Sequence, residues 1–187
     1  MILKINNSGI IKEPHEMSKQ LVFKTTKRVH EQKARDMEIF KDNMCMYTPI
    51  QERNLRNGIE KLEKILQSFA PNSIMQYREY DIYDLKRMIK DGHFLYGDRA
   101  KVIAGPPGQC HRNSSELWKL NYKNFNVHIE TGYALSKDGM WYQHSWLVLF
   151  NKKNQIEVIE ATPLRRIAYY GFQLTHKEAV KFYNDHH

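Results

Sequence analysis

The sequence predicts an α+β fold in which helices come first and an antiparallel sheet follows. Apolar residues recur at three- and four-residue steps over residues 55–69, which is the pattern of one buried helical face. Beyond Asn121 the pattern changes to short segments of alternating apolar and polar residues, separated by turn residues, as in strands. Helices and strands that are segregated along a chain in this way are typical of α+β domains.

Two segments precede the first well-defined helix. Residues 1–16 are expected to form a strand or a loosely held arm, and residues 17–46 are basic with mostly helical propensity. A helix then begins after Thr48, because threonine is a good N-cap and proline, here Pro49, is favoured in the first turn. It ends at residues 70–72. Its apolar stripe comprises Leu55, Ile59, Leu62, Ile65, Leu66 and Phe69.

Three further helices are predicted. One covers residues 81–90, and the last follows the capping residue Thr175. Between them lies the segment Gly105-Pro106-Pro107-Gly108, which continues neither a helix nor a paired strand. The third helix therefore starts directly after this segment and covers residues 110–120. The residues that it is expected to turn toward the core are Leu117, Trp118 and Leu120.

Four strands are predicted in the second half of the chain, because alternating segments are bounded there by turn residues. They cover residues 125–135, 141–150, 156–159 and 167–174, with turns at residues 136–139 and 151–154.

Composition indicates one globular unit with a helical extension. We expect residues 1–72 to form this N-terminal extension and residues 73–187 to form the core domain. The formal net charge of +8 is compatible with an anionic partner, such as nucleic acid or an acidic protein surface. The basic residues are spread along the sequence without a run of five, so a solvated surface is the simpler interpretation. The sequence leaves the oligomeric state open.

Cysteine usage and the start of the chain predict a cytoplasmic protein. The two cysteines, Cys45 and Cys110, lack the spacing of a disulfide framework and are expected to be reduced. The first six residues lack the apolar stretch of about 7–15 residues that a signal peptide contains. No apolar run approaches the roughly 20 residues that span a bilayer, so no membrane contact is expected.

Cys110 is a candidate nucleophile because of its position at a helix start. A cysteine attacks as the thiolate, and a helix N-terminus or a nearby imidazole lowers the pKa of its thiol. The free N–H groups of the first helical turn also stabilise the oxyanion of a tetrahedral intermediate. Taken alone, a single cysteine is more often an inert buried thiol.

His144 and Glu160 supply an imidazole and a carboxylate downstream of Cys110. His144 lies in the strand predicted over residues 141–150, and Glu160 ends the next strand, so a hairpin places the two side by side. A carboxylate there accepts a hydrogen bond from the imidazole and fixes its orientation. Taken singly, His144 is explained as a hydrogen-bonded core histidine and Glu160 as a solvated residue at a strand end. Taken together with Cys110, the two residues predict a catalytic triad. The residues expected on the same strand face as His144 are Tyr142, Trp146 and Val148.

Four short motifs resemble the transglutaminase-like branch of the papain-fold cysteine enzymes. The resemblance covers residues 105–175 and implies a cysteine-bearing helix packed on an antiparallel sheet. It also implies Cys110 as the nucleophile, His144 as general base and then acid, and Glu160 as the orienting acid. The family usually has Asp at the last position, and the extra methylene of Glu160 changes its reach to His144. The motifs are Gly108-Gln109-Cys110, Thr131-Gly132-Tyr133-Ala134-Leu135, His144-Ser145-Trp146 and Glu160-Ala161-Thr162-Pro163.

Four further residues are candidates for the cleft or for the oxyanion site. Gln109 offers a side-chain donor next to the nucleophile, and His111 is either a charge near the substrate or a solvated helix residue. Tyr133 and Trp146 are expected in the core or in the cleft wall. No metal or other cofactor is expected, because no Cys-x2-Cys or His-x3-His pair accompanies the possible ligands.

These features favour a hydrolase of amide, peptide or related acyl bonds that works through a covalent acyl-enzyme. A protein or peptide substrate is expected from that chemistry. Two alternatives remain: a transglutaminase or other acyltransferase of the same fold, and a non-catalytic basic module that binds nucleic acid or an acidic protein.

Overall fold

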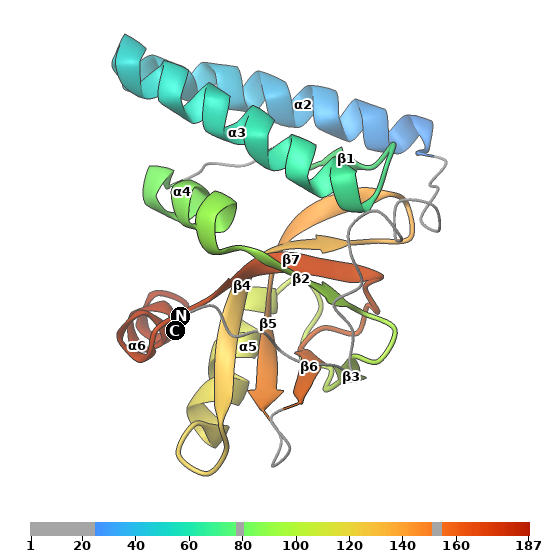
Figure 1. Ribbon diagram of the computed structural model, residues 1–187, viewed down its shortest axis with the longest axis vertical. Coiled ribbons are helices and arrows are strands. Elements are labelled where there is room, and N and C mark those ends of the chain that lie inside the picture. Colours follow the sequence, from blue (N-terminus) through green and yellow to red (C-terminus); the bar gives the residue numbers. More distant parts are fainter. Residues whose placement is uncertain (1–24, 78–80, 151–154) are drawn as a thin grey trace.

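The computed structural model describes residues 25–77, 81–150 and 155–187, and over these residues the chain has the predicted α+β architecture. A curled sheet lies beneath a long helical hairpin, and shorter helices pack around it (Figure 1). The segment expected at residues 1–16, the first eight residues of the helical segment expected at residues 17–46, and the turn expected at residues 151–154 lie outside the described residues.

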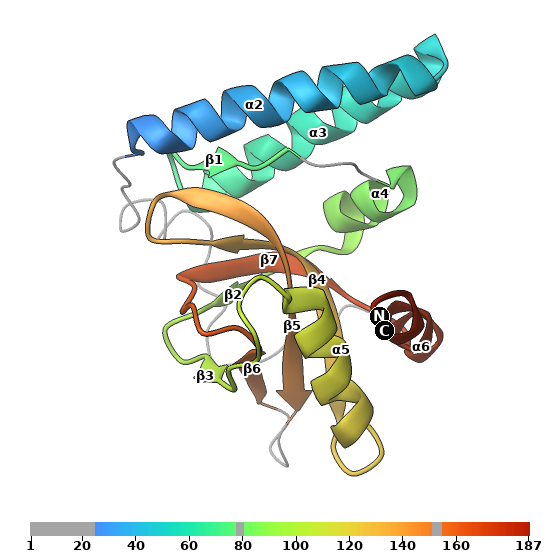
Figure 2. The same cartoon turned by 180° about the vertical axis from the view of Figure 1, so that it is seen from behind.

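The helical hairpin is the first described part of the chain. Helix α2 spans Lys27–Asn43, the 3-10 turn η1 spans Met44–Met46, and helix α3 spans Pro49–Phe69. Thr48 caps α3 as predicted, because its hydroxyl accepts a hydrogen bond from the backbone N–H of Gln51 and the Gln51 side chain reaches back to the Thr48 N–H. The predicted apolar stripe packs α3 against the rest of the protein, and α2 lies along its outer side (Figure 2).

Three shorter helices follow. Helix α4 spans Ile82–Asp91, α5 spans Cys110–Asn121 and α6 spans His176–Asp185. The side chains of Asp81 and Thr175 cap α4 and α6, which confirms both predicted helix starts.

The predicted orientation of α5 is only partly correct. Trp118 is 2% exposed and belongs to the core, whereas Leu120 is 74% exposed, so its expected burial is wrong. An α-helix has about 3.6 residues per turn, so a residue two positions after Trp118 points to nearly the opposite side.

Four long strands match the four predicted ones. Neighbouring strands pair antiparallel, with β4 between β5 and β7 and with β6 beyond β5. Their bounds are β4 Val127–Leu135, β5 Met140–Phe150, β6 Ile156–Glu160 and β7 Ala168–Gln173.

Three short strands correct the expectation of a purely antiparallel sheet. They are β1 (Ile74–Met75), β2 (His93–Tyr96) and β3 (Lys101–Val102). Strand β2 pairs antiparallel with β7, but β1 and β3 run parallel to β5 and β6. The sheet is therefore mixed, with the order β2-β7-β4-β5-β6-β3 and with β1 beside β5. Strands of two to four residues carry too little alternation to be recognised in the sequence.

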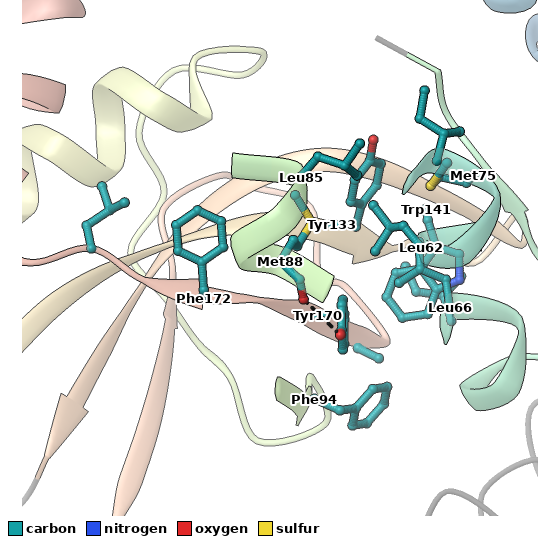
Figure 3. Close-up of a cluster of buried hydrophobic side chains, with 14 of the residues drawn as sticks. Leu62, Leu66, Met75, Leu85, Met88, Phe94, Tyr133, Trp141, Tyr170 and Phe172 are labelled. Atoms are coloured by element: carbon teal, nitrogen blue, oxygen red, sulfur yellow. Dashed lines mark hydrogen bonds between the residues drawn. The ribbon is translucent and has the colours of Figure 1, made fainter. Parts of the chain in front are cut away.

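Two hydrophobic clusters cover the two faces of the sheet. The larger one fills the space between the sheet and the helices α3, α4, α5 and α6, and part of it is drawn in Figure 3. Within it the Tyr170 hydroxyl donates a hydrogen bond to the carbonyl oxygen of Met88 in α4, at 3.1 Å. The smaller cluster covers the face that carries His144; its buried members are Ala134, Trp146, Val148, Val158 and Tyr169.

The hairpin of α2 and α3 shares the larger core with the sheet. The division expected at residue 72, between an N-terminal extension and a core domain, stays a prediction. Among the described helices, none combines the length and apolar character needed to cross a membrane.

We expect Leu62→Ala in α3 to lower the free energy of unfolding by about 2–5 kcal/mol, because it leaves a cavity beneath the hairpin. Leu62 is 0% exposed, whereas Ile50 on the same helix is 73% exposed. Ile50→Ala is therefore the control and should change stability by no more than about 0.5 kcal/mol. Chemical denaturation followed by circular dichroism measures both, and equal effects would contradict the packing of α3.

Candidate active site

Cys110 occupies the first position of α5, as the sequence predicts. The preceding loop turns at Gly108, whose φ of 75° lies in the left-handed region that favours glycine. Gln109 follows as the cap residue, and its carbonyl oxygen accepts the first helical hydrogen bond from the N–H of Asn113, at 2.8 Å. Because the helix starts here, the N–H groups of residues 110–112 have no carbonyl acceptor in a preceding turn.

Two buried polar side chains of the next turn fix this end of α5. Asn113 Nδ2 donates to the carbonyl oxygens of Pro106, at 2.8 Å, and of Ala161, at 3.0 Å, so it ties the loop to the end of β6. Ser114 Oγ donates to the carbonyl oxygen of Ser145, at 2.9 Å, so it ties the helix to β5. The position of the thiol is therefore set by buried hydrogen bonds to two strands.

The start of α5 lies at an interruption in the sheet. On the side of β5 away from β4, β1 pairs with residues 140–141 and β6 pairs with residues 147–150. No described strand pairs on that side with residues 142–146. Cys110 reaches the strand edge through this gap, where its thiol hydrogen-bonds to the His144 side chain and to the backbone of Ser145.

His144 and Glu160 meet as the predicted hairpin requires. The His144 Nε2–H group is shared between the two carboxylate oxygens of Glu160, with Nε2 at 3.0 Å from Oε1 and 2.9 Å from Oε2. The side chains are 1% and 0% exposed. Since Nε2 is engaged by the carboxylate, Nδ1 is the ring nitrogen left for the hydrogen bond between His144 and Cys110. Cys110, His144 and Glu160 thus lie in one hydrogen-bonded line.

Two residues whose roles the sequence does not reveal complete the surroundings of Glu160. Thr162 donates both its backbone N–H and its hydroxyl to Oε1, at 2.9 and 2.7 Å, and the Tyr169 hydroxyl donates to Oε2, at 2.9 Å. Thr162 lies two residues after Glu160 in the Glu-Ala-Thr-Pro motif, and this motif is a local signal from which a turn around the carboxylate can be predicted. Tyr169 comes from β7 and gives no local signal. Every lone-pair direction of the buried carboxylate is thereby used.

Aromatic rings surround the His144–Glu160 hydrogen bond. The ring of His144 lies 6.3 Å, centroid to centroid, from each of the rings of Trp146 and Tyr169, with interplanar angles of 20° and 24°. Trp146 and Tyr169 are both 0% exposed and are 4.9 Å apart. Gly171 provides room for the indole, because a Cβ at this position would lie 2.7 Å from Trp146 Cη2. The rings keep water away from the imidazole–carboxylate pair.

The thiol and the imidazole shift each other's pKa in opposite directions. Burial by itself raises the pKa of Cys110, but the hydrogen bond and charge of His144, with backbone hydrogen bonds from Ser145 and His111, lower it below 9.0. Burial by itself lowers the pKa of His144, but Cys110 and Glu160 raise it above 6.5. The geometry therefore favours a thiolate beside an imidazolium.

Glu160 remains the negative partner of that imidazolium. Burial raises the pKa of its carboxyl group, but the hydrogen bond and charge of His144 and the two hydrogen bonds from Thr162 outweigh burial and lower the pKa below 4.5. A buried carboxylate with a cationic partner and full hydrogen bonding stays ionised at neutral pH.

Gln109 and His111 lie beside the thiol, as expected. Gln109 is exposed and its side chain makes no capping hydrogen bond. His111 is half-buried, and its Nδ1 lies 2.7 Å from the hydroxyl oxygen of Ser145. The proposed roles of these two residues remain predictions. A pocket of about 310 Å³ opens here, lined by Gly108, Gln109, Cys110, His111, Arg112 and His186.

Of the two positions expected for Tyr133 and Trp146, the core or the cleft wall, the structure places both residues in the core. Tyr133 is 0% exposed, and its hydroxyl donates to the carbonyl oxygen of Gln76 in the larger core, at 3.2 Å. It pairs with the residue next to His144, so strand alternation turns it to the other face of the sheet. Trp146 is equally buried and lies against His144. Its role is therefore in the packing of the imidazole.

No group of three or more His, Cys, Asp or Glu side chains that could hold a metal ion is found within residues 25–77, 81–150 and 155–187.

Comparisons with protein-family models, with curated proteins and with solved structures give no match. The function of the chain is therefore inferred from the geometry described above.

We expect the pKa of the Cys110 thiol to lie below 9.0, the ordinary value of a free thiol, because the hydrogen bond and charge of His144 outweigh the effect of burial. A lowered thiol pKa means that the thiolate persists as the pH falls below 9.0. The ultraviolet absorbance of the thiolate, taken as the difference between wild type and Cys110→Ser, measures this. In His144→Ala the titration should return towards that of an ordinary thiol. An unchanged titration would contradict the pairing.

We expect Asn113→Ala to lower the alkylation rate of Cys110 and to cost about 1–3 kcal/mol of stability, because the loss of both Asn113 hydrogen bonds frees the loop at Pro106 from the end of β6 at Ala161. Asn121→Ala is the matched control on the same helix, since Asn121 Nδ2 bonds only to the carbonyl of Leu117 in its own helix, at 2.7 Å. Mass spectrometry of the alkylated protein and thermal unfolding give the two readouts. Equal alkylation rates in the two variants would show that Asn113 does not position the thiol.

Proposed function

We propose that this protein is a cysteine-dependent hydrolase of amide or peptide bonds. The observation that carries the proposal is the buried line from the thiol at the start of α5 through His144 to Glu160. A thiolate beside an imidazolium is an activated nucleophile, and a carboxylate behind the imidazole holds its orientation. The transglutaminase-like enzymes that the motifs resemble use the same three groups.

The triad supports a two-step reaction through an acyl-enzyme. The Cys110 thiolate attacks the carbonyl carbon, and the C=O electrons move to the oxygen. When the tetrahedral intermediate collapses, the C–N bond breaks, and the His144 imidazolium gives its proton to the leaving amine. His144 then takes a proton from water, whose oxygen attacks the thioester, and the carboxylic acid leaves as the thiolate re-forms. Glu160 keeps its charge and position throughout.

The helix start supplies the oxyanion stabilisation. The backbone N–H of Cys110 is at the first helical position and has no carbonyl acceptor within the helix. The exposed side chain of Gln109, adjacent in sequence, offers a second donor. A removed oxyanion donor costs about 10²–10³-fold in the rate of comparable enzymes.

An extended peptide fits the edge of β5 beside the thiol. On this side of the strand the carbonyl of Trp141 accepts a hydrogen bond from the segment of β1, and the carbonyl of Ser145 accepts one from α5. The backbone groups of alternate residues in a strand point to the same side, so those of Gln143 point here as well. No described strand pairs with them. A substrate strand that pairs with Gln143 would carry a peptide bond past Cys110.

The papain-like or transglutaminase-like fold is part of this proposal. It is supported by the cysteine-bearing helix packed against a curled sheet that carries the imidazole and the carboxylate on neighbouring strands. A cytoplasmic location goes with the proposal, because a reducing compartment keeps the thiol free.

Two alternatives lead to different products or ligands. In an acyltransferase, an amine would attack the thioester in the second step in place of water, and the product would be a new amide. A basic binding module would use the net charge of +8 to hold nucleic acid or an acidic protein, with no need for the thiol.

We expect a library of fluorogenic peptide amides to contain substrates of the wild-type protein, and Cys110→Ala to abolish their hydrolysis. His144→Ala should lower kcat by about 10³-fold or more, because thiol activation and proton transfer are both lost. Glu160→Gln should lower kcat by roughly 10³–10⁴-fold, because the imidazolium loses its carboxylate.

Two measurements separate the alternatives. Mass spectrometry of products formed with an added primary amine distinguishes transfer from hydrolysis. Retention on a polyanion that weakens with salt but survives Cys110→Ala would support the binding module. If Cys110 alkylates no faster than the exposed Cys45, the hydrolase proposal is wrong.

A further inference from the structure

Glu130 is a second buried carboxylate on the sheet face that carries His144. It lies in β4 directly opposite Trp146 of β5 and is 2% exposed. Its Oε2 accepts a hydrogen bond from the indole Nε1–H of Trp146, at 3.0 Å. Its Oε1 lies 3.0 Å from Nε2 of His93 in β2. Glu130 thus connects three strands beneath the triad.

A carboxylate at this depth needs a reason, because a neutral acceptor would also satisfy an indole N–H. An ionised acceptor makes a shorter and stronger hydrogen bond than a neutral one, but burying its charge is costly unless a partner compensates it. His93 is that partner. Burial lowers the pKa of His93, but the hydrogen bond and charge of Glu130 outweigh burial and raise it above 6.5. Glu130 therefore has a compensating partner and can hold the indole firmly.

The indole links Glu130 to the triad. Trp146 and His144 are two residues apart on the same face of β5, with ring centroids 6.3 Å apart and nearly parallel planes. The indole also contacts the ring of Tyr169, with 4.9 Å between the centroids, and the Tyr169 hydroxyl donates to Glu160. If the indole moved, both the His144 imidazole and the Tyr169 ring would lose a packing partner. These two rings hold the Glu160 carboxylate and the Cys110 thiol in their places.

We propose that Glu130 is a positioning residue for the triad, which it serves by holding the Trp146 indole against His144. This proposal rests on the proposed function, because the orientation of His144 matters for catalysis only if the Cys110–His144 pair is the working nucleophile. His93 completes the arrangement by compensating the buried charge.

The test compares Glu130→Leu with Glu130→Gln and measures the pH profile of Cys110 alkylation by iodoacetamide, with Cys45 in the same molecule as the internal reference. Glu130→Leu removes the acceptor and should lower the neutral-pH rate about tenfold or more, since small displacements in an active site have effects of this order. Its profile should move towards that of an ordinary thiol. Glu130→Gln keeps a weaker, neutral acceptor for the indole, and its rate should lie between those of wild type and Glu130→Leu.

Ser73→Ala is the matched control for destabilisation alone. The Nε1–H of Trp141 donates to Ser73 Oγ at 2.9 Å, and both side chains are buried, so this variant also orphans a buried indole N–H. Trp141 is the β5 residue paired with β1 and lies outside the ring cluster of His144. Ser73→Ala should lower the thermal unfolding temperature and leave the Cys110 pH profile unchanged.

The outcomes separate the two proposals. An unchanged Cys110 profile in Glu130→Leu would make Glu130 a structural residue only. If that variant does not fold, Trp146→Phe removes the indole N–H and keeps a ring, and an unchanged profile there overturns the proposal equally. A wild-type Cys110 no more reactive than Cys45 overturns both proposals. A reactive Cys110 without hydrolysis of any peptide amide overturns only the proposed function.

Discussion

The interruption on the outer edge of β5 is the constraint on which the site depends. Strand β6 ends at Glu160, and Pro163, which lacks an N–H donor, follows shortly after. That ending opens the edge of β5 to the start of α5, and it leaves the last side chain of β6 next to the imidazole. One early strand end therefore brings the thiol and the carboxylate to His144 from two sides.

The buried carboxylates of Glu160 and Glu130 are tolerated because both oxygens of each have polar partners. Glu160 receives hydrogen bonds from His144, Thr162 and Tyr169, and Glu130 is held by Trp146 and His93. An unsatisfied buried donor or acceptor costs about 1–3 kcal/mol, so such a network is rigid: no member can rotate away without leaving another unpaired. The aromatic rings between the two carboxylates exclude the water that would otherwise replace a lost partner. The rigidity of the network and the alignment of the thiol, imidazole and carboxylate thus have the same origin.

The sequence predicts the parts of the structure that are determined locally. The caps at Thr48 and Thr175 and the helix start at Cys110 follow from neighbouring residues, and the His144–Glu160 pair follows from strand alternation and one hairpin. Parallel pairing of β1 with β5 joins residues 74 and 140, and no local pattern indicates so distant a partner. The same limit applies to Tyr169. For Tyr133 the sequence leaves the core and the cleft wall open, and the pairing of β4 with β5 turns it to the face opposite His144, in the larger core.

The use of Glu where the resembled family has Asp has a geometric reason in this chain. Val148 of β5 pairs with Val158 of β6, and continuing this register by one more alternate residue puts Glu160 opposite Trp146, not opposite His144. Glu160 is therefore a diagonal neighbour of His144. Diagonal positions on neighbouring strands are about 7–8 Å apart, and only long side chains span this distance. The additional methylene supplies that reach and brings both oxygens to 2.9–3.0 Å from Nε2. The longer acid is thus matched to the register of β6, and the position of the carboxylate, more than its residue type, is what the imidazole requires.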